Sequence, residues 1–254
     1  MRRESTSTTR LCTVLLLALT FLPVFLLANP ARSQTFNLRF KVYYLGMRVG
    51  DLRLQARDST TDSGRRLRLV HLHSRTGRLA GALFSVKNEY TVLYDPASLQ
   101  LLRVTKSIRQ SNVSHRVVIE YSGSRATLHD HVTRRWTTPG PALDVVALMD
   151  VLLRVRARDT TFTVPLDQEA APMKAWVRVY SGREGRFATA VVRKSGPKTR
   201  RWKTDLLTNR FSKAGARLEV RFRKDESAPY QLRYSLGPAM ATARLVDDQG
   251  KRKK

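Results

Sequence analysis

Apolar and polar residues alternate along most of the chain from about residue 36 onward. Leu38, Phe40 and Val42 fall on one side of an extended segment, whereas Arg39 and Lys41 fall on the other. A period of two is typical of β-strands that have one buried face and one exposed face. Similar segments recur until about residue 246 and are separated by turn residues; the stretch 201–207 (RWKTDLL) is one of these expected strands. The pattern predicts one mainly β domain over residues 34–246, in which an antiparallel curved sheet forms an open barrel or a sandwich.

One segment near the middle, at about residues 142–156, departs from this alternation and predicts a helix packed on the sheet. Its apolar residues follow helical spacing: Val145, Leu148, Met149 and Leu152. Asp144 precedes them as a candidate N-cap, and Arg154, Arg156 and Arg158 follow at the end where the helix dipole favours cations. A helix with one apolar stripe must bury that stripe. The segment is therefore expected to be either a movable lid over an open sheet or a fixed plug in its core.

The first 33 residues read as a secretory signal peptide. A basic start with Arg2, Arg3 and Arg10 precedes an apolar run, and small residues surround Arg32. An uncleaved membrane anchor is the alternative. The single cysteine, Cys12, would leave with this leader, and an exported chain without disulfides fits a bacterial periplasm. The other end, residues 247–254, is expected to be a basic disordered tail.

The chain carries a formal net charge of +27, and removal of the leader, which holds four Arg and one Glu, leaves +24. Such a field attracts polyanions and anionic membrane surfaces. Export argues against nucleic acid, so anionic lipid or another envelope polyanion is the expected partner, through peripheral membrane contact. The alternative is ordinary arginine usage on solvated strand faces. Six cations lie opposite apolar strand positions and are the candidate exposed contacts: Arg39, Lys41, Arg53, Arg221, Arg223 and Arg233.

Histidines are the first place to look for a metal site, because two pairs have the spacing H-x-H. Alternate residues of a strand share a face, so His71 and His73, or His129 and His131, could bind one metal ion together. Each pair needs a third ligand, and the high positive charge disfavours cation capture. His71 and His73 are therefore only weak candidates, and no metal and no cofactor is expected.

No pattern in the sequence singles out a catalytic centre. The mature chain has no G-x-S-x-G motif and no cysteine nucleophile. Six acids lie in expected turns without forming a distinctive pair: Asp95, Asp167, Asp225, Glu226, Asp247 and Asp248. The segment 181–185 bears two glycines, but it reads as a hairpin turn rather than a phosphate-binding loop. Whether the protein is an enzyme stays open, and the sequence favours the answer that it is not.

Aromatic residues on the expected strands suggest a cavity. Most of them should be core residues, but some would line an internal cavity of the kind that takes an acyl chain if the sheet curves without closing. The residues concerned are Phe40, Tyr44, Tyr90, Tyr94, Trp176, Trp202, Phe222, Tyr230 and Tyr234.

Four patterns in a fixed order give the chain a family resemblance. They are FKVYYLGMRVGDLRLQA, NEYTVLYDPASLQLLRV, PALDVVALMDVLLRVR and LEVRFRKDESAPYQLRYSLGPAMATARLV, within residues 36–246. In this order they resemble the bacterial exported family called domain of unknown function 3108. The resemblance implies a β-rich domain of the Gram-negative envelope with no established reaction and supplies no catalytic residue. The high charge, the basic tail and the stretch 193–205 depart from the family pattern.

Three functions are compatible with these observations. The first is a non-enzymatic periplasmic protein that binds a lipid or another amphiphilic envelope component. The second is a structural partner of an outer-membrane assembly, and the third is a hydrolase of envelope glycan or lipid. The oligomeric state is not constrained by the sequence.

Overall fold

The structure is a computed structural model that describes residues 35–111, 113–138, 140–155, 159–196, 204–224, 226 and 228–246. The expected signal peptide and the expected basic tail both lie outside these residues. The strands are β1 (Phe36–Tyr44), β2 (Met47–Thr60), β3 (Arg66–Thr76), β4 (Lys87–Asp95), β5 (Gln100–Gln110), β6 (Val113–Ser122), β7 (Arg125–His129), β8 (Arg134–Thr137), β9 (Thr160–Gln168), β10 (Ala171–Gly182), β11 (Gly185–Lys194), β12 (Arg217–Phe222), β13 (Pro229–Leu236) and β14 (Ala239–Val246). The helices are α2 (Arg78–Leu83), α3 (Val145–Arg154) and α4 (Leu206–Phe211).

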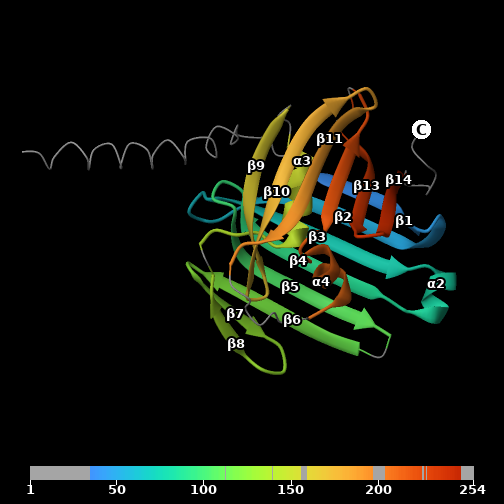
Figure 1. Ribbon diagram of the computed structural model, residues 1–254. Coiled ribbons are helices and arrows are strands. Elements are labelled where there is room, and N and C mark those ends of the chain that lie inside the picture. The colour runs from blue at the N-terminus through green and yellow to red at the C-terminus, as the bar shows by residue number, and fades with distance from the viewer. Residues whose placement is uncertain are drawn as a thin grey trace, which may run out of the picture. The chain divides into compact units, whose positions relative to one another are not determined.

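All the strands belong to a single antiparallel sheet, as the alternating sequence predicts. Their order is β8-β7-β6-β5-β4-β3-β2-β1-β14-β13-β12-β11-β10-β9. Neighbouring strands are therefore consecutive in the chain except for β1 and β14, and the consecutive strands β8 and β9 form the two free edges. At that junction Phe40 pairs with Leu245. The sheet curves so that β9–β14 lie across β2–β8 with α3 between them (Figure 1). The prediction of a mainly β protein with a curved antiparallel sheet is confirmed.

The strand faces follow the alternation of residue types. On β2, Leu52, Leu54 and Ala56 are buried, whereas Arg53 and Gln55 between them are half-buried on the outer face. Burial of the apolar side chains on one face drives the sheet to curve around a common core. That core is continuous through both halves of the sheet.

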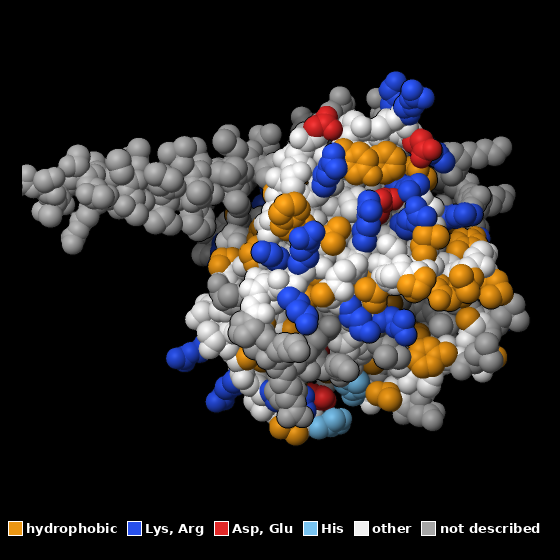
Figure 2. Space-filling model, viewed as in Figure 1, with side chains coloured by type: hydrophobic (Ala, Val, Ile, Leu, Met, Phe, Trp, Pro, Cys, Tyr) orange, Lys and Arg blue, Asp and Glu red, His pale blue; other side chains and the backbone are white. Residues whose placement is uncertain are grey.

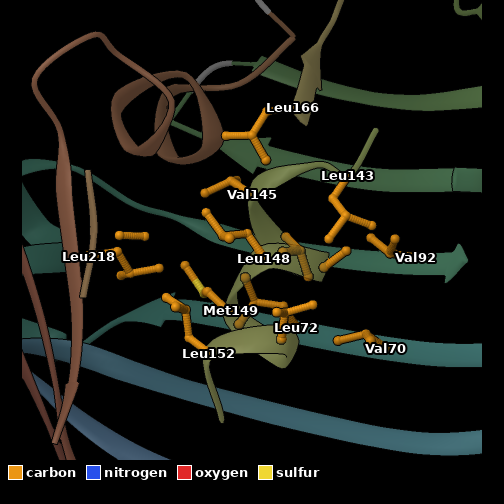
Figure 3. Close-up of a cluster of buried hydrophobic side chains, with 14 of the residues drawn as sticks. Val70, Leu72, Val92, Leu143, Val145, Leu148, Met149, Leu152, Leu166 and Leu218 are labelled. Atoms are coloured by element: carbon orange, nitrogen blue, oxygen red, sulfur yellow. The ribbon is translucent and has the colours of Figure 1, made fainter. Parts of the chain in front are cut away.

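Helix α3 lies inside the curved sheet rather than on its rim. The Asp144 side chain caps it by accepting a 2.7 Å hydrogen bond from the Ala147 amide, as predicted. Leu148, Met149 and Leu152 pack among side chains from both halves of the sheet, including Leu72 and Leu218 (Figure 3). Every residue from Val145 to Leu153 is buried, so burial extends beyond the predicted apolar stripe to all sides of the helix. The helix is surrounded on all sides and therefore acts as a core plug.

The segment before α3 covers one free edge of the sheet. Leu143 N donates to Pro165 O at 3.0 Å, and Asp167 N donates to Leu143 O at 2.9 Å. These bonds satisfy backbone groups that β9 would otherwise leave unpaired at the sheet edge.

Two short helices, α2 and α4, were not predicted. The expected strand at 201–207 is wrong, because α4 begins within it: the Asp205 side chain accepts a 2.8 Å hydrogen bond from the Thr208 amide and caps the first turn. Of the helices in the described part of the chain, none is long and apolar enough to span a membrane.

Candidate functional site

An apolar cavity of about 180 Å³ lies between the inner face of the sheet, α3 and α4. Its walls come from β1, β2, β3, β12, β13, β14 and both helices. The aliphatic side chains and the phenylalanine that line it are Val42, Val49, Leu52, Val86, Met149, Leu207, Phe211, Leu218, Leu232, Ala241 and Ala243. The cavity is partly open. This chemistry suits an apolar group, because burial from water is then the main source of binding energy.

Small residues create the space for this cavity. Cross-strand pairing places Leu232, Ala243, Val42 and Gly50 in one row across β13, β14, β1 and β2. Ala243 and Gly50 leave room that larger side chains would fill. A Cβ atom at Gly50 would lie only 2.3 Å from the Arg75 carbonyl oxygen, so the close approach of β2 to β3 depends on glycine here.

Aromatic residues close the side of the cavity next to α4. The rings of Phe211 and Tyr234 meet edge to face with centroids 4.6 Å apart. The Tyr234 hydroxyl donates a 2.8 Å hydrogen bond to the Arg210 carbonyl oxygen, which ties α4 to β13. Tyr234 is the aromatic residue, of those singled out in the sequence, that lines the cavity.

The other aromatic candidates lie elsewhere. Phe40, Tyr90, Tyr94 and Phe222 are core residues, as expected. Trp176 and Tyr44 are exposed on the surface, and Trp202 lies outside the described residues. The remaining candidate, Tyr230, lies under the Arg223 guanidinium.

A buried ion cluster next to the cavity joins α4 to both halves of the sheet. Lys106 on β5 is 2% exposed, and its ammonium contacts Glu169 in the β9–β10 turn and Asp205 Oδ2 at 3.1 Å. The same ammonium lies 3.0 Å from the hydroxyls of Thr204 and Thr208. Burial alone would lower the pKa of Lys106, but the two carboxylates raise it above its usual value. The cluster is therefore a fixed ion pair network rather than a reactive amine.

The turn that carries Glu169 has an unusual backbone. Glu169 and Ala170 have φ values of 52° and 72°, in the left-handed region that disfavours residues other than glycine. Glu169 is 1% exposed and also accepts from Thr204 N at 3.1 Å. The contacts to Lys106 and Thr204 therefore hold a turn that the residue types alone would not favour.

A second buried cluster fixes α3 to β3 and β4. Arg68 Nη2 lies 3.0 Å from Asp150 Oδ1, and Arg154 Nε lies 2.9 Å from Asp150 Oδ2. The Tyr94 hydroxyl also donates to Asp150. Burial, followed by the Asp150 charge, raises the pKa of Tyr94 well above its usual value, so this phenol stays protonated. These contacts explain how a carboxylate is accommodated on a fully buried helix.

The six predicted surface cations come together on one part of the outer face. Five of them lie on β1, β2, β12 and β13, and Arg223 directly follows β12. Together with β14 these strands are adjacent, and the cavity lies on their inner side. Figure 2 shows Lys and Arg side chains interspersed with hydrophobic ones over the face formed by β9–β14.

The expectation that all six cations are exposed holds only for Arg39; the other five are half-buried. Neighbouring side chains cover them. The guanidinium of Arg221 lies 5.5 Å from the Phe187 ring centroid and that of Arg223 5.6 Å from the Tyr230 centroid. Arg53 Nε donates to the Asn37 amide oxygen at 3.0 Å, and Arg233 Nε lies 2.9 Å from the Met240 sulfur.

The candidate histidines do not converge. His71 and His73 share the outer face of β3: the first hydrogen-bonds Thr91 at 3.0 Å, and the second lies 3.8 Å from Glu89. His129 ends β7 and His131 lies beyond it, so this pair does not share a strand. No three His, Cys, Asp or Glu side chains in the described part of the chain are grouped to hold a metal ion.

The predicted acids are dispersed. Asp95 caps a turn by accepting from Ala97 N at 2.8 Å, Asp167 is buried beside Trp136, and Glu226 pairs with Arg223. Asp225, Asp247 and Asp248 lie outside the described residues. The segment 181–185 is a hairpin turn between β10 and β11, as expected.

Sequence reasoning missed the residues that shape the cavity and the buried clusters. Gly50, Ser74 and Ala243 are small residues whose role depends on which strands become neighbours. Lys106 and Glu169 are 63 residues apart in the chain. The alternation on β3, which places Ser74 on the inner face with Leu72, was the available signal.

Comparison with known proteins agrees with this fold. A crystal structure of a β-barrel-like protein of domain of unknown function DUF1849 from Brucella abortus matches with a TM-score of 0.52 at 8% sequence identity. The match covers 85% of this chain and 98% of that one, and at this identity it shows the fold alone. A search of curated proteins finds no match. A family model described as protein of unknown function (DUF3108) matches residues 39–243. Because the match covers most of the chain, as the four sequence patterns predicted, this protein belongs to the DUF3108 family.

Proposed function

We propose that this protein is an exported, periplasmic component of a Gram-negative cell envelope that binds the apolar part of an amphiphile without catalysing a reaction. The observation that carries the proposal is the partly open apolar cavity between β1, β2, β13, β14 and α4. Its lining is dominated by aliphatic and aromatic side chains. Among the acids that the structure describes, the buried ones are held in ion pairs or hydrogen bonds, which favours binding over hydrolysis.

The size of the cavity limits what it can hold. An engineered cavity of about 150 Å³ in another protein binds benzene, so a cavity of 180 Å³ accommodates on the order of six carbon atoms. Drug-sized ligands usually occupy pockets of roughly 300 Å³ or more. The proposed ligand therefore inserts the end or one segment of a single chain and leaves the rest outside.

The outer face of the same strands supplies the second part of the proposal. Arg39, Lys41 and Arg53 lie on β1 and β2, directly behind the cavity wall, and Arg221 and Arg233 continue the charge onto β12 and β13. An anionic lipid surface complements this charge, at about 1 kcal/mol for each cation near the membrane. We therefore propose that the protein docks on anionic lipid through this face.

The first test is native mass spectrometry of the protein purified from a bacterial periplasm, combined with lipid extraction of the same sample. A co-purifying amphiphile is expected, and Ala243→Leu should reduce its occupancy by filling the cavity. The loss should be about fourfold for each methylene displaced, since one buried CH₂ contributes about 0.8 kcal/mol. Ser114→Leu, at an exposed position of β6, is the matched control. Equal occupancy in both variants would overturn the cavity as the binding site.

The second test is liposome sedimentation with a charge-matched control. Replacing Arg39, Lys41 and Arg53 by Gln should weaken binding to anionic liposomes by roughly fivefold per charge. The same replacement of Arg103, Arg109 and Arg116, which are exposed on β5 and β6, should have a smaller effect. Binding should also fall in 1 M salt, where the screening length is about 3 Å. Equal binding to neutral liposomes would contradict the docking proposal.

A further inference from the structure

Exposed hydrophobic side chains gather at one end of the curved sheet. In the described part of the chain eight large hydrophobic residues are exposed, and two of them, Val132 after β7 and Trp176 on β10, stand apart. The other six lie in or beside turns and define the apolar end of the sheet: Tyr44, Leu45, Met47, Phe84, Val113 and Met240. Figure 2 shows hydrophobic side chains gathered where Figure 1 places α2. Exposed apolar patches of this kind mark sites of contact with proteins or membranes.

Backbone contacts bring four connections of the chain together at the apolar end. The β1–β2 turn lies beside the β13–β14 turn, because Tyr44 pairs with Ala241. A 2.9 Å hydrogen bond from Gly77 N to Val49 O holds the connection between β3 and β4, which contains α2, next to β2. Ser111 N in the β5–β6 turn donates at 2.8 Å to a carbonyl oxygen of that same connection. The exposed hydrophobic residues are therefore neighbours in space although they are far apart in the sequence.

Leu45 occupies a turn position that suits other residue types. Leu45 and Gly46 are the central residues of the β1–β2 hairpin, and their φ values of 49° and 81° match a type I′ turn, which favours Asn-Gly. The left-handed backbone disfavours leucine, and this leucine side chain is 76% exposed. Met47, which ends the turn, is 67% exposed. Neither backbone geometry nor hydration favours these side chains at the tip, so they suit contact with an apolar phase.

Cations surround the apolar end. Arg48 at the start of β2, Arg78 at the start of α2 and Lys87 at the start of β4 are all exposed. Asp51, an acid at the same end, accepts from Arg48 at 2.7 Å, so its charge is balanced. Apolar tips among cations match an anionic membrane, in which hydrocarbon lies beneath negatively charged headgroups. The same cations on a second copy of the chain would oppose self-association.

We infer that the apolar end inserts into one leaflet of an anionic lipid bilayer, with Leu45 and Met47 leading. This inference rests on the proposed docking on anionic lipid and adds the part of the molecule that enters the hydrocarbon. The cavity extends to the same end, because Val49, Thr76 and Val86 line it. Insertion therefore brings the hydrocarbon of the bilayer close to the cavity wall.

Site-specific fluorescence tests the insertion. In a Cys12→Ser background, Leu45→Cys carries the only thiol of the chain and is labelled with an environment-sensitive dye. On vesicles of phosphatidylcholine and phosphatidylglycerol the emission should shift to shorter wavelength, and lipids that carry a spin label on the acyl chain should quench it. Ser124→Cys, labelled in the same background, is the matched control. It lies in the exposed β6–β7 turn, at the opposite end of β6 from Val113, and should show neither effect.

Leu45→Asn separates insertion from folding. Asparagine suits the left-handed backbone and forms the favoured Asn-Gly turn, so the melting temperature should be unchanged or higher. Binding to the same vesicles should nevertheless weaken roughly tenfold, the effect of withdrawing one largely buried leucine side chain from hydrocarbon. Val132→Asn, at an exposed valine outside the apolar end, is the matched control and should leave vesicle binding unchanged.

The outcomes distinguish insertion from the proposed docking. If the protein binds the anionic vesicles but the label at residue 45 neither shifts nor is quenched, or Leu45→Asn binds as tightly as the wild-type protein, insertion is overturned and docking stands. If the wild-type protein does not bind these vesicles, both are overturned. Sedimentation velocity without lipid completes the test, because a dimer that dissociates in Leu45→Asn would assign the apolar end to a second copy and overturn insertion.

Discussion

Trp136 Nε1 on β8 donates a 3.0 Å hydrogen bond to Asp167 Oδ2 on β9. These two strands are the free edges of the sheet, so one side-chain bond connects the ends that backbone pairing leaves apart. Trp136 also meets Tyr121 edge to face, with ring centroids 6.5 Å apart. Side chains thus connect β8 and β9, the two edges of the curved sheet that no backbone hydrogen bonds join.

Loss of this bond should loosen the closure. Trp136→Phe keeps the aromatic packing but removes the N–H donor, which leaves a buried carboxylate with one partner fewer. We expect the free energy of unfolding to fall by about 1–3 kcal/mol in urea denaturation. Trp176→Phe, at a tryptophan that is 49% exposed, is the control and should change stability by no more than about 0.5 kcal/mol. Equal effects of the two substitutions would count against the closure.

The ion cluster around Lys106 should be sensitive to removal of its cation. Lys106→Met leaves Glu169 and Asp205 buried without a counter-charge, and a loss of about 3–5 kcal/mol in unfolding free energy is expected. The deficit should shrink in mildly acidic buffer, because protonation of a carboxylate then relieves the unpaired charge. Lys87→Met, at an exposed position of β4, is the matched control. A deficit independent of pH would show that packing, not charge, causes the loss.

Stability should increase on mild acidification of the wild-type protein. Burial raises the pKa of Asp144 and of Asp167 to about 6, from 3.8. The folded state therefore binds protons more readily than the unfolded state, and stability from these groups rises as the pH falls through 6 and is complete below about 4. A pKa difference of one unit between the folded and unfolded states corresponds to about 1.4 kcal/mol of unfolding free energy. The pKa values of three other carboxyl groups are lowered, those of Asp58, Asp95 and Asp205. The stability that these groups contribute is lost only in stronger acid.

Denaturation at pH 5 and pH 7.5 provides the measurement. We expect the higher unfolding free energy at pH 5, and a smaller difference in Asp167→Asn, which cannot ionise. A wild-type protein that is less stable at pH 5 than at pH 7.5 would refute this expectation.

Two glycine substitutions should have opposite effects. Gly50→Ala brings a Cβ atom to 2.3 Å from the Arg75 carbonyl oxygen, so β2 and β3 must separate and the protein should be destabilised. Gly81→Ala lies within α2, where the new Cβ meets the Thr76 hydroxyl at an ordinary 3.4 Å. Because alanine favours a helix over glycine, that variant should be neutral or more stable by about 0.5–1 kcal/mol. Melting curves of both variants check the close approach that shapes the cavity wall.

Local signals made the architecture predictable. The alternation around Phe40 and the Asp144 cap each act over a few residues, so the sequence displays them directly. The complete burial of α3 was not predictable in this way, because Asp150 reads as a polar position until Arg68 and Arg154 are known to surround it. Likewise, α4 is short, and its cap at Asp205 is stabilised by Lys106 from a distant strand.

An open curved sheet made a cavity predictable, but the residues that line the cavity could not be predicted. Ala243 becomes part of the cavity wall only after β14 pairs with β1 and β1 with β2. The predicted cations lie on the predicted face, but their exposure depended on aromatic neighbours such as Phe187 that come from other strands.

The pairing of β1 with β14 also determines when the molecule can finish folding. Phe40 meets Leu245 near opposite ends of the described chain, so this contact closes a very large loop and forms slowly compared with the hairpins between consecutive strands. Until the last strand is available, β1 and β13 are unpaired edges, and unpaired edges readily join with other chains. A polypeptide emerges from a ribosome or a translocation channel with its N-terminus first. The sheet can therefore be completed only after β14 has emerged.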